Sequence, residues 1–369
     1  MDEATTGPDS NGVRLLPLEF SDLPGWRRDD HGAAFAAFRR SAAGRKTSPP
    51  RQRAIGFDAA ALADILARAE ALPESLSDRE ARAFFEANFV AREVVTEAGR
   101  GFFTGYYEPE VEGSLTRSDA FPVPLHSQPE ELVEFDPAKP PPGIDPALRF
   151  ARKSDEGWSA YHDRAAIAAG ALDGRNLELV WLADPVDAFF IHIQGAARIR
   201  LTDGRTMRVT YAAKSGHPYT PIGRVLIERG ALAPGAATMP AIRAWLAEHP
   251  DEAAGVMNAN RSYIFFREAP VDDETAGPVA AAKVQLTAER SLAVDRLIHT
   301  FHTPVWIETT LPDGSAFHHL MVAQDTGSAI VGPARGDIFF GSGAAAGEIA
   351  GAMAREGRFV VLVPRETAS

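Results

Sequence analysis

Apolar residues recur at helical spacing in the first hundred residues of the chain. Residues 57–72 give the clearest signal, because Leu62, Ile65 and Leu66 line one face, Asp58 can cap the start and Pro73 stops the helix. Residues 77–80 fit a capping box that opens a second helix, with phenylalanines at 84, 85 and 89. Further helices are predicted at residues 31–40, 164–172, 222–229, 241–248 and 345–355, after a disordered lead over residues 1–13.

After residue 99 the pattern changes to short apolar runs broken by glycine and proline, which predicts strands. Residues 189–194 alternate, so Phe190, His192 and Gln194 would share one face of a strand that looks onto a groove or onto solvent. The acidic segment 270–278 is a predicted crossover between domains. Other strands are predicted at residues 101–109, 177–183, 263–266, 284–286, 294–296, 304–308, 318–323 and 359–363, with a hairpin joining 198–201 to 207–211.

Two aspartates stand beside turns in the glycine-rich closing stretch, residues 321–343. Asp325 follows an apolar run, and Asp337 precedes the apolar triplet at 338–340. An aspartate next to glycine often caps a turn, which is one reading of both. The other reading is chemical, because a carboxyl embedded in apolar sequence is poorly solvated, and its raised pKa lets it hold a proton near neutral pH.

Composition narrows the classes of function. A chain of 369 residues, 45% of them apolar, predicts one or two folded domains. The net charge of −12 argues against nucleic acid as a partner, and the absence of cysteine excludes disulfides and thiolate metal sites. The histidines are scattered, so no metal site is expected, and no motif for a cofactor is present. No apolar run approaches the ~20 residues of a membrane span, and the polar, acidic N-terminus is not a signal peptide, so we expect a cytosolic protein or a trimmed form.

Carboxylate chemistry therefore remains, together with clusters of Tyr, Gln, Lys, Arg and Gly. Aromatic rings pack on the faces of sugars, while amide and guanidinium groups bind hydroxyl and N-acetyl groups. This combination favours a sugar polymer as the substrate.

Four stretches of the chain resemble the membrane-bound lytic murein transglycosylase A family: GFFTGYYEPEVEGS (101–114), IHIQGAARIRL (191–201), YAAKSGHPYTPIGR (211–224) and the closing segment 323–343. The last resembles the three-aspartate module of that family. The resemblance implies a mainly β fold with some α. It also implies a double-psi β-barrel built from residues 1–105 and 272–369, a β-rich domain inserted at 106–271, and a saccharide groove between the two.

The resemblance also implies an activity. The family cleaves the β-1,4 bond between N-acetylmuramic acid and N-acetylglucosamine without water and leaves a 1,6-anhydro ring. Its catalytic aspartate falls on Asp337 and the first aspartate of the module on Asp325, whereas no carboxylate follows in IFFGSGAAAG. The glycan-binding residues expected from the resemblance are Thr104, Gly105, Tyr106, Tyr107, Gln194, Lys214, His217 and Arg335.

Two other functions stay open at this point. A hydrolase on the same barrel needs a second carboxylate, for which Asp325 and Glu308 are the local candidates. A non-catalytic wall-binding module of the expansin type needs none. The expected partners are peptidoglycan glycan strands and a cell-wall enzyme complex, with the protein itself a monomer. A periplasmic location, with association to the outer membrane, follows from the family alone, since the chain has no cysteine for a lipid anchor.

Overall fold

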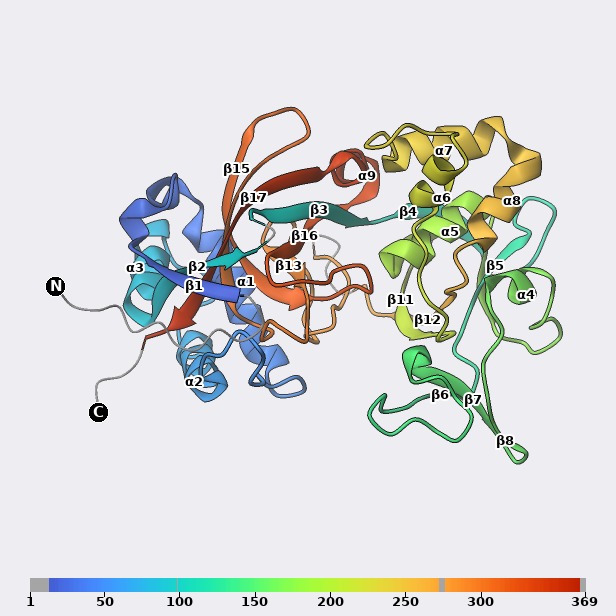
Figure 1. Cartoon of the computed structure of the whole chain (residues 1–369), viewed down its shortest axis with the longest axis horizontal. Coiled ribbons are helices and arrows are strands. Elements are labelled where there is room, and N and C mark those ends of the chain that lie inside the picture. Colours follow the sequence, from blue (N-terminus) through green and yellow to red (C-terminus); the bar gives the residue numbers. More distant parts are fainter. Residues whose placement is uncertain (1–12, 98, 272–275, 366–369) are drawn as a thin grey trace. The chain divides into compact units, whose positions relative to one another are not determined.

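The computed structural model describes residues 13–97, 99–271 and 276–365, and its chain is mainly β with some α (Figure 1). Contacts group the chain into two compact units. Unit 1 comprises Met1–Tyr107, Thr275–Gly341 and Met353–Ser369, and unit 2 comprises Glu108–Glu274 and Ser342–Ala352. The predicted disordered lead lies outside the described residues, except for residue 13. Residues 272–275 of the predicted crossover also lie outside them.

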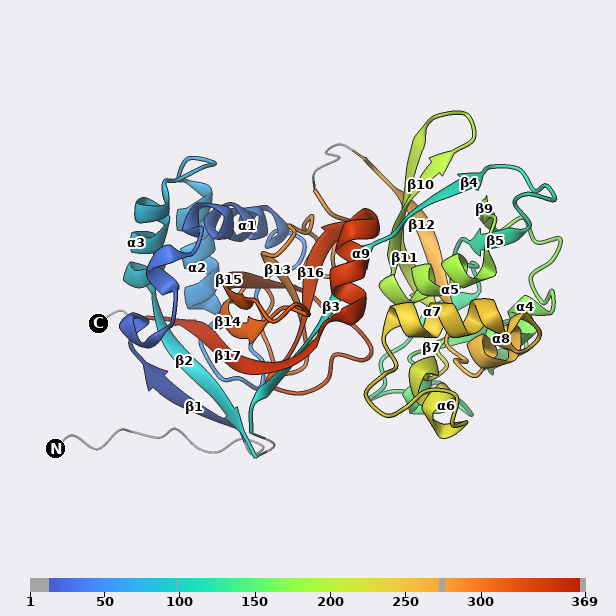
Figure 2. The same cartoon turned by 90° about the horizontal axis from the view of Figure 1, so that it is seen from above.

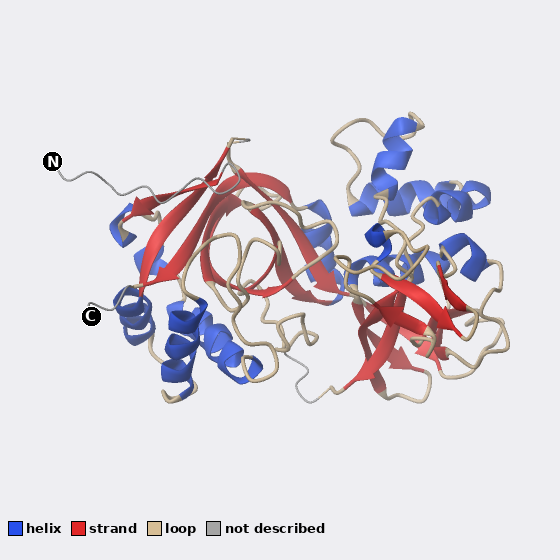
Figure 3. Ribbon diagram, turned by 60° about the horizontal axis from the view of Figure 1, so that its bottom comes forward, coloured by secondary structure: helices blue, strands red, loops and turns tan. Residues whose placement is uncertain are grey.

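Unit 1 is built on an eight-stranded sheet whose pairings close on themselves. The order is β1-β2-β17-β14-β15-β13-β16-β3, and β17 also pairs with β3, so six of the strands form a ring (Figure 3). The ring closes because β17 is long enough to pair with β3 through its first residues and with β14 and β2 further on. The strands are β1 (Val13–Leu18), β2 (Phe89–Thr96), β3 (Gly101–Glu108), β13 (Ser291–Val294), β14 (Pro304–Thr310), β15 (Ala316–Asp325), β16 (Arg335–Ser342) and β17 (Ala354–Pro364).

Three helices pack beside this barrel: α1 (His31–Gly44), α2 (Ala59–Glu70) and α3 (Asp78–Asn88) (Figure 2). Asp58 accepts a hydrogen bond from the N–H of Ala60, and Ser77 forms the capping box predicted for α3. Apolar faces of the helices join Trp306 of β14 in one core. The helices predicted from spacing in this part of the chain are confirmed.

Unit 2 contains a six-stranded sheet, order β12-β11-β10-β4-β9-β5, and a small sheet, β6-β7-β8. The predicted hairpin is confirmed as the antiparallel pair β10–β11. The strands are β4 (Glu110–Ser114), β5 (Val123–His126), β6 (Leu132–Glu134), β7 (Phe150–Ser154), β8 (Gly157–Ser159), β9 (Glu178–Leu182), β10 (Ala196–Leu201), β11 (Thr206–Lys214) and β12 (Ile264–Ala269). The helices are α4 (Arg164–Ala168), α5 (Pro185–Gln194), α6 (Ile222–Glu228), α7 (Met239–Glu248), α8 (Pro250–Asn258) and α9 (Gly343–Ala352).

The strand predicted at residues 189–194 is wrong, because this segment is the second half of helix α5. Asp184 caps the helix through the N–H of Val186, Pro185 occupies its first turn, and Gly195 ends it with a positive φ of 77°. These are the residues that start and stop helices. Alternation over only six residues is weaker evidence for a strand than these capping residues on both sides are for a helix. On the helix, Phe190 and Gln194 are four residues apart and share a face, whereas His192 does not lie on it.

Three smaller expectations also change. Residues 284–286 make one isolated bridge and no strand, and the strand expected at 294–296 lies at Ser291–Val294. The helix expected at 345–355 is α9, which ends at Ala352. Gly357 belongs to β17, where a Cβ would lie 2.3 Å from the carbonyl oxygen of Glu308, so the close packing of strands requires this glycine. Helix α8, which begins at Pro250, was not predicted from the pattern.

Candidate active site

Strands β3 and β16 are neighbours, and three side-chain pairs join them on one face. The Phe102 ring meets the Arg335 guanidinium, the Thr104 hydroxyl meets Asp337, and the Tyr106 ring lies 5.3 Å from the ring of Phe339. Each pair is two residues further along both strands than the last. Alternate residues of a strand point to the same side, so the three pairs form one continuous row.

Asp337 occupies the middle of this row and is half-buried. Thr104 donates a hydrogen bond from its hydroxyl to Oδ1 of Asp337. Burial raises the pKa of Asp337, and the charge of Arg335 and the hydrogen bond from Thr104 oppose that rise only in part. A carboxyl with a raised pKa that solvent can still reach is suited to donating a proton.

Arg335 positions Thr104 in turn. Its Nη2 donates to the Thr104 hydroxyl oxygen over 2.7 Å, while its Nη1 donates to the carbonyl oxygens of Phe102 and Gly336. Because the threonine oxygen accepts from Arg335, its single hydrogen is available for Asp337. Arg335, Thr104 and Asp337 thus form a directed chain of hydrogen bonds, which we call the relay.

Asp325 lies at the end of β15 and is held on both carboxyl oxygens. Tyr106 donates from its hydroxyl to Oδ2 over 3.1 Å, and the backbone N–H of Ala281 donates to Oδ1 over 3.1 Å. Burial raises the pKa of Asp325 despite these bonds, and Asp337 adds to the rise. Burial and the two aspartates together raise the pKa of Tyr106 well above its ordinary value, so its hydroxyl stays a donor.

The other expected glycan-binding residues divide between the units. Gly105 and the buried Tyr107 lie on β3 in unit 1, on either side of Tyr106. Gln194 ends α5 and Lys214 ends β11, both half-buried in unit 2. The structure therefore brings Thr104, Tyr106 and Arg335 together with the two aspartates in unit 1, and it places the remaining polar candidates in unit 2.

His217, the last expected glycan-binding residue, is also in unit 2. It is buried, and its Nε2 lies 2.7 Å from the carbonyl oxygen of Tyr161. This contact gives the histidine a structural role.

Glu308, one of the two candidates for a second carboxylate, makes structural bonds within unit 1. It is buried on β14, and it accepts hydrogen bonds from Arg358 over 3.0 Å and from Trp306 Nε1 over 3.1 Å. Asp325 is therefore the better placed of the two candidates for a partner of Asp337.

Sequence reasoning missed two residues, one in the row of unit 1 and one in unit 2. Phe102 forms the exposed end of the row, and only its place two residues before Thr104 could have indicated this. Glu108, in the motif GYYEP, is fully buried in unit 2, where its carboxylate lies 2.9 Å from Nε of Arg198 and 2.7 Å from Nε of Arg208. Ser342 at the end of β16 donates to the same carboxylate over 2.7 Å.

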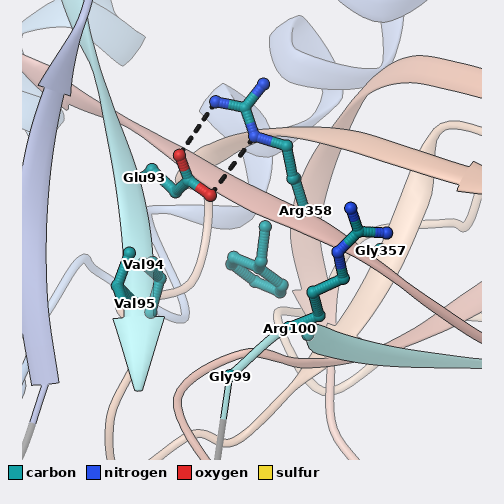
Figure 4. Close-up of a pocket in the computed structure, with 9 residues that line it drawn as sticks. Glu93, Val94, Val95, Gly99, Arg100, Gly357 and Arg358 are labelled. Atoms are coloured by element: carbon teal, nitrogen blue, oxygen red, sulfur yellow. Dashed lines mark hydrogen bonds and ion pairs between the residues drawn. The ribbon is translucent and has the colours of Figure 1, made fainter. Parts of the chain in front are cut away.

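A cavity of about 190 Å³ opens near the start of β3, where Arg358 bonds to Glu93 (Figure 4). Its lining includes Gly101, which pairs with Gly357 across to β17. Odd-numbered residues of β3, such as the buried Phe103, point away from the face that carries Thr104. The cavity is therefore separate from the Asp337 site. It is lined by Glu93, Val94, Val95, Gly99, Arg100, Gly101, Gly357, Arg358 and Phe359.

Within residues 13–97, 99–271 and 276–365, no group of three or more His, Asp or Glu side chains is placed to hold a metal ion. In the same residues, no helix has the length and apolar character needed to cross a membrane.

Comparison with known proteins shows the family of the chain. A crystal structure of membrane-bound lytic murein transglycosylase from Agrobacterium tumefaciens is 48% identical, covers 95% of this chain and 98% of its own, and superposes with a TM-score of 0.87. The chain belongs to the MltA family. Family profiles agree, since the MltA specific insert domain matches residues 102–267 and the 3D domain matches residues 290–363. The resemblance stated from the sequence is confirmed.

Two more distant members bear on function. Membrane-bound lytic murein transglycosylase A of Escherichia coli (strain K12) is 33% identical over 269 residues, which are 70% of this chain and 65% of that relative. The chain thus matches slightly less than two thirds of the length of that curated relative. A crystal structure of E. coli MltA with bound chitohexaose is 26% identical, with a TM-score of 0.64, and covers 98% of this chain and 93% of its own.

Proposed function

We propose that this protein is a peptidoglycan lytic transglycosylase that cleaves the β-1,4 bond between N-acetylmuramic acid and N-acetylglucosamine without water. The observation that carries the proposal is the half-buried Asp337, with its raised pKa, at the end of the relay. Membership of the MltA family supports the substrate class, because relatives are named lytic murein transglycosylases and one holds chitohexaose.

The relay assigns the two oxygens of Asp337. Oδ1 accepts the hydrogen of Thr104, whose oxygen is already taken as an acceptor by Arg335. With the bonds in this direction, a proton on the carboxyl sits on Oδ2, which is the acidic oxygen in this proposal. Positioning a proton in advance removes the need to reorient groups during the reaction.

One acid is sufficient for the proposed reaction. Asp337 donates the Oδ2 proton to the glycosidic oxygen as the bond from that oxygen to C1 of the muramic acid breaks. The new carboxylate then takes the proton of the C6 hydroxyl of the same sugar, and that oxygen bonds to C1 to close the 1,6-anhydro ring. Asp337 ends protonated as it began, and the tethered nucleophile needs no activated water.

Asp325 has a supporting role in this proposal. Bonds from Tyr106 and from the Ala281 N–H engage both of its oxygens and hold the carboxyl to the rest of unit 1. A hydrolase needs its second carboxylate free to act as base or nucleophile. The bonding of Asp325 therefore favours the transglycosylase over the hydrolase.

Several finer expectations stay proposals. Gly105, Tyr106, Tyr107, Gln194, Lys214 and His217 are proposed to contact the glycan or to shape its site. The double-psi crossing of the barrel strands, the domain limits at 105–106 and 271–272, and the saccharide groove also stay predictions. The family name points to the cell envelope as the location, which we propose here together with peptidoglycan strands as the partner.

The experiment is the digestion of purified peptidoglycan followed by mass spectrometry of the products. We expect muropeptides lighter by one water than hydrolysis products, and none from Asp337→Asn. Ordinary reducing ends would establish a hydrolase instead, and binding without any products would establish a wall-binding module.

A further inference from the structure

Phe102 is the only exposed member of the row, with 43% of its surface accessible to solvent. Tyr106, at the other end, is 9% exposed. Large aromatic side chains are usually buried in folded proteins, and an exposed ring beside a candidate catalytic acid offers an apolar face to a ligand. Phe102 lies two residues from Thr104, so its backbone is roughly 6.6 Å along the strand from the residue that touches Asp337. This spacing is comparable with the length of one sugar unit.

The backbone of Phe102 is bonded through both its N–H and its carbonyl oxygen, and its ring contacts Arg335. The N–H of Phe102 donates to the carbonyl oxygen of Ala334 over 2.9 Å, and its carbonyl oxygen accepts from Arg335 Nη1. The Arg335 guanidinium carbon lies over the ring, 5.4 Å from its centroid. A planar ring has two faces, and a cation on one of them leaves the other for a ligand.

We propose that the Phe102 ring is a stacking platform for the hexosamine unit next to the scissile bond, a binding role that rests on the proposed function. The C–H groups of a pyranose face pack on an aromatic ring, and a platform that is fixed before binding loses little freedom on binding. Arg335 then has two tasks, since it supports the platform and orients the relay.

The test uses chitohexaose as the probe and the full chain in the Asp337→Asn background, so that the probe is not consumed. We expect Phe102→Ala to weaken binding about tenfold, and Phe102→Trp to bind at least as well as the parent. Leu297→Ala removes another exposed apolar side chain of unit 1, 58% exposed, and should leave affinity unchanged. Thermal unfolding checks that each variant is folded.

A second measurement separates a platform from a mere support for Arg335. In the active protein, Phe102→Ala should raise KM about tenfold on peptidoglycan and leave the pH profile of kcat in place. A shifted profile would mean that the ring acts through Arg335, which would overturn the platform.

The results also separate this inference from the proposed function. Unchanged affinity in Phe102→Ala, with anhydro products from the parent, would remove the platform and keep the transglycosylase. Weakened affinity without anhydro products from the parent would keep the platform and remove the transglycosylase. Failure of the parent to bind chitohexaose would remove the platform outright, and the peptidoglycan digest would still decide the activity.

Discussion

Asp325 and Asp337 are register partners of the same residue. Ala293, on strand β13 between them, pairs with Asp325 of β15 on one side and with Asp337 of β16 on the other. Two interstrand spacings separate their backbones, about 10 Å, and residues in register tend to share a face of the sheet. The barrel therefore places two acids of raised pKa side by side, and their unequal bonding gives them different tasks.

Replacing Asp337 by asparagine should stabilise the folded protein at neutral pH. The folded-state pKa of Asp337 is raised by burial, so the wild type loses stability as pH rises from the unfolded value near 3.8 through the folded pKa. Asparagine does not titrate, so the advantage of Asp337→Asn should be absent in acid and grow with pH. Urea unfolding at several pH values measures this difference, while activity should fall by about 100-fold or more. An advantage that shrinks as pH rises would contradict the raised pKa.

Removing the Thr104 hydroxyl should slow catalysis and shift its pH dependence. Thr104→Val keeps the shape but loses the hydrogen bond that lowers the pKa of Asp337, so that pKa should rise. The protonated acid would then persist to higher pH, and the alkaline limb of the kcat profile should shift to higher pH. Loss of a bond to a charged group predicts a fall in kcat of about ten- to a hundredfold. Thr104→Ser keeps the hydroxyl and should restore both rate and profile, which a role in packing alone would not predict.

Truncating Asp325 should cost stability more than rate. Asp325→Ala leaves the Tyr106 hydroxyl and the Ala281 N–H without their acceptor, at about 1–3 kcal/mol for each buried donor. Turnover per folded molecule should stay within about tenfold of the wild type, because the relay on Asp337 is intact. Unfolding curves measure the loss of stability, and rates corrected for the folded fraction measure the turnover. A loss of rate equal to that of Asp337→Asn, in a stable variant, would make Asp325 a second catalytic carboxylate.

Much of the site was readable from the sequence because its parts are local. The turn-rich setting of Asp325 and Asp337 and the polar residues of β3 lie in short motifs, and the described structure brings the two aspartates, Thr104 and Arg335 into one unit. The relay itself was not readable, since residues 104 and 335 are 231 positions apart and meet only when β3 joins β16. Helix α5 was misread because its caps lie outside the alternating window. The buried Glu108 was overlooked because nothing local shows that two arginines converge on it.

Glu108 leads to a final prediction, on the stability of unit 2. Its carboxylate is fully buried, lies between Arg198 and the buried Arg208 and accepts from Ser342, so Glu108→Gln removes the charge that compensates both cations. Breaking a buried ion pair from one side costs about 3–5 kcal/mol. We therefore expect a large fall in the free energy of unfolding, measured by urea titration.

Glu110→Gln provides the matched control. Glu110 also contacts Arg198, over 3.3 Å, but its side chain is 41% exposed. An exposed pair contributes at most about 1 kcal/mol, so this variant should unfold almost like the wild type. Equal losses from the two substitutions would mean that burial does not set the strength of these pairs. A loss confined to Glu108→Gln would show that burial sets the strength of these pairs.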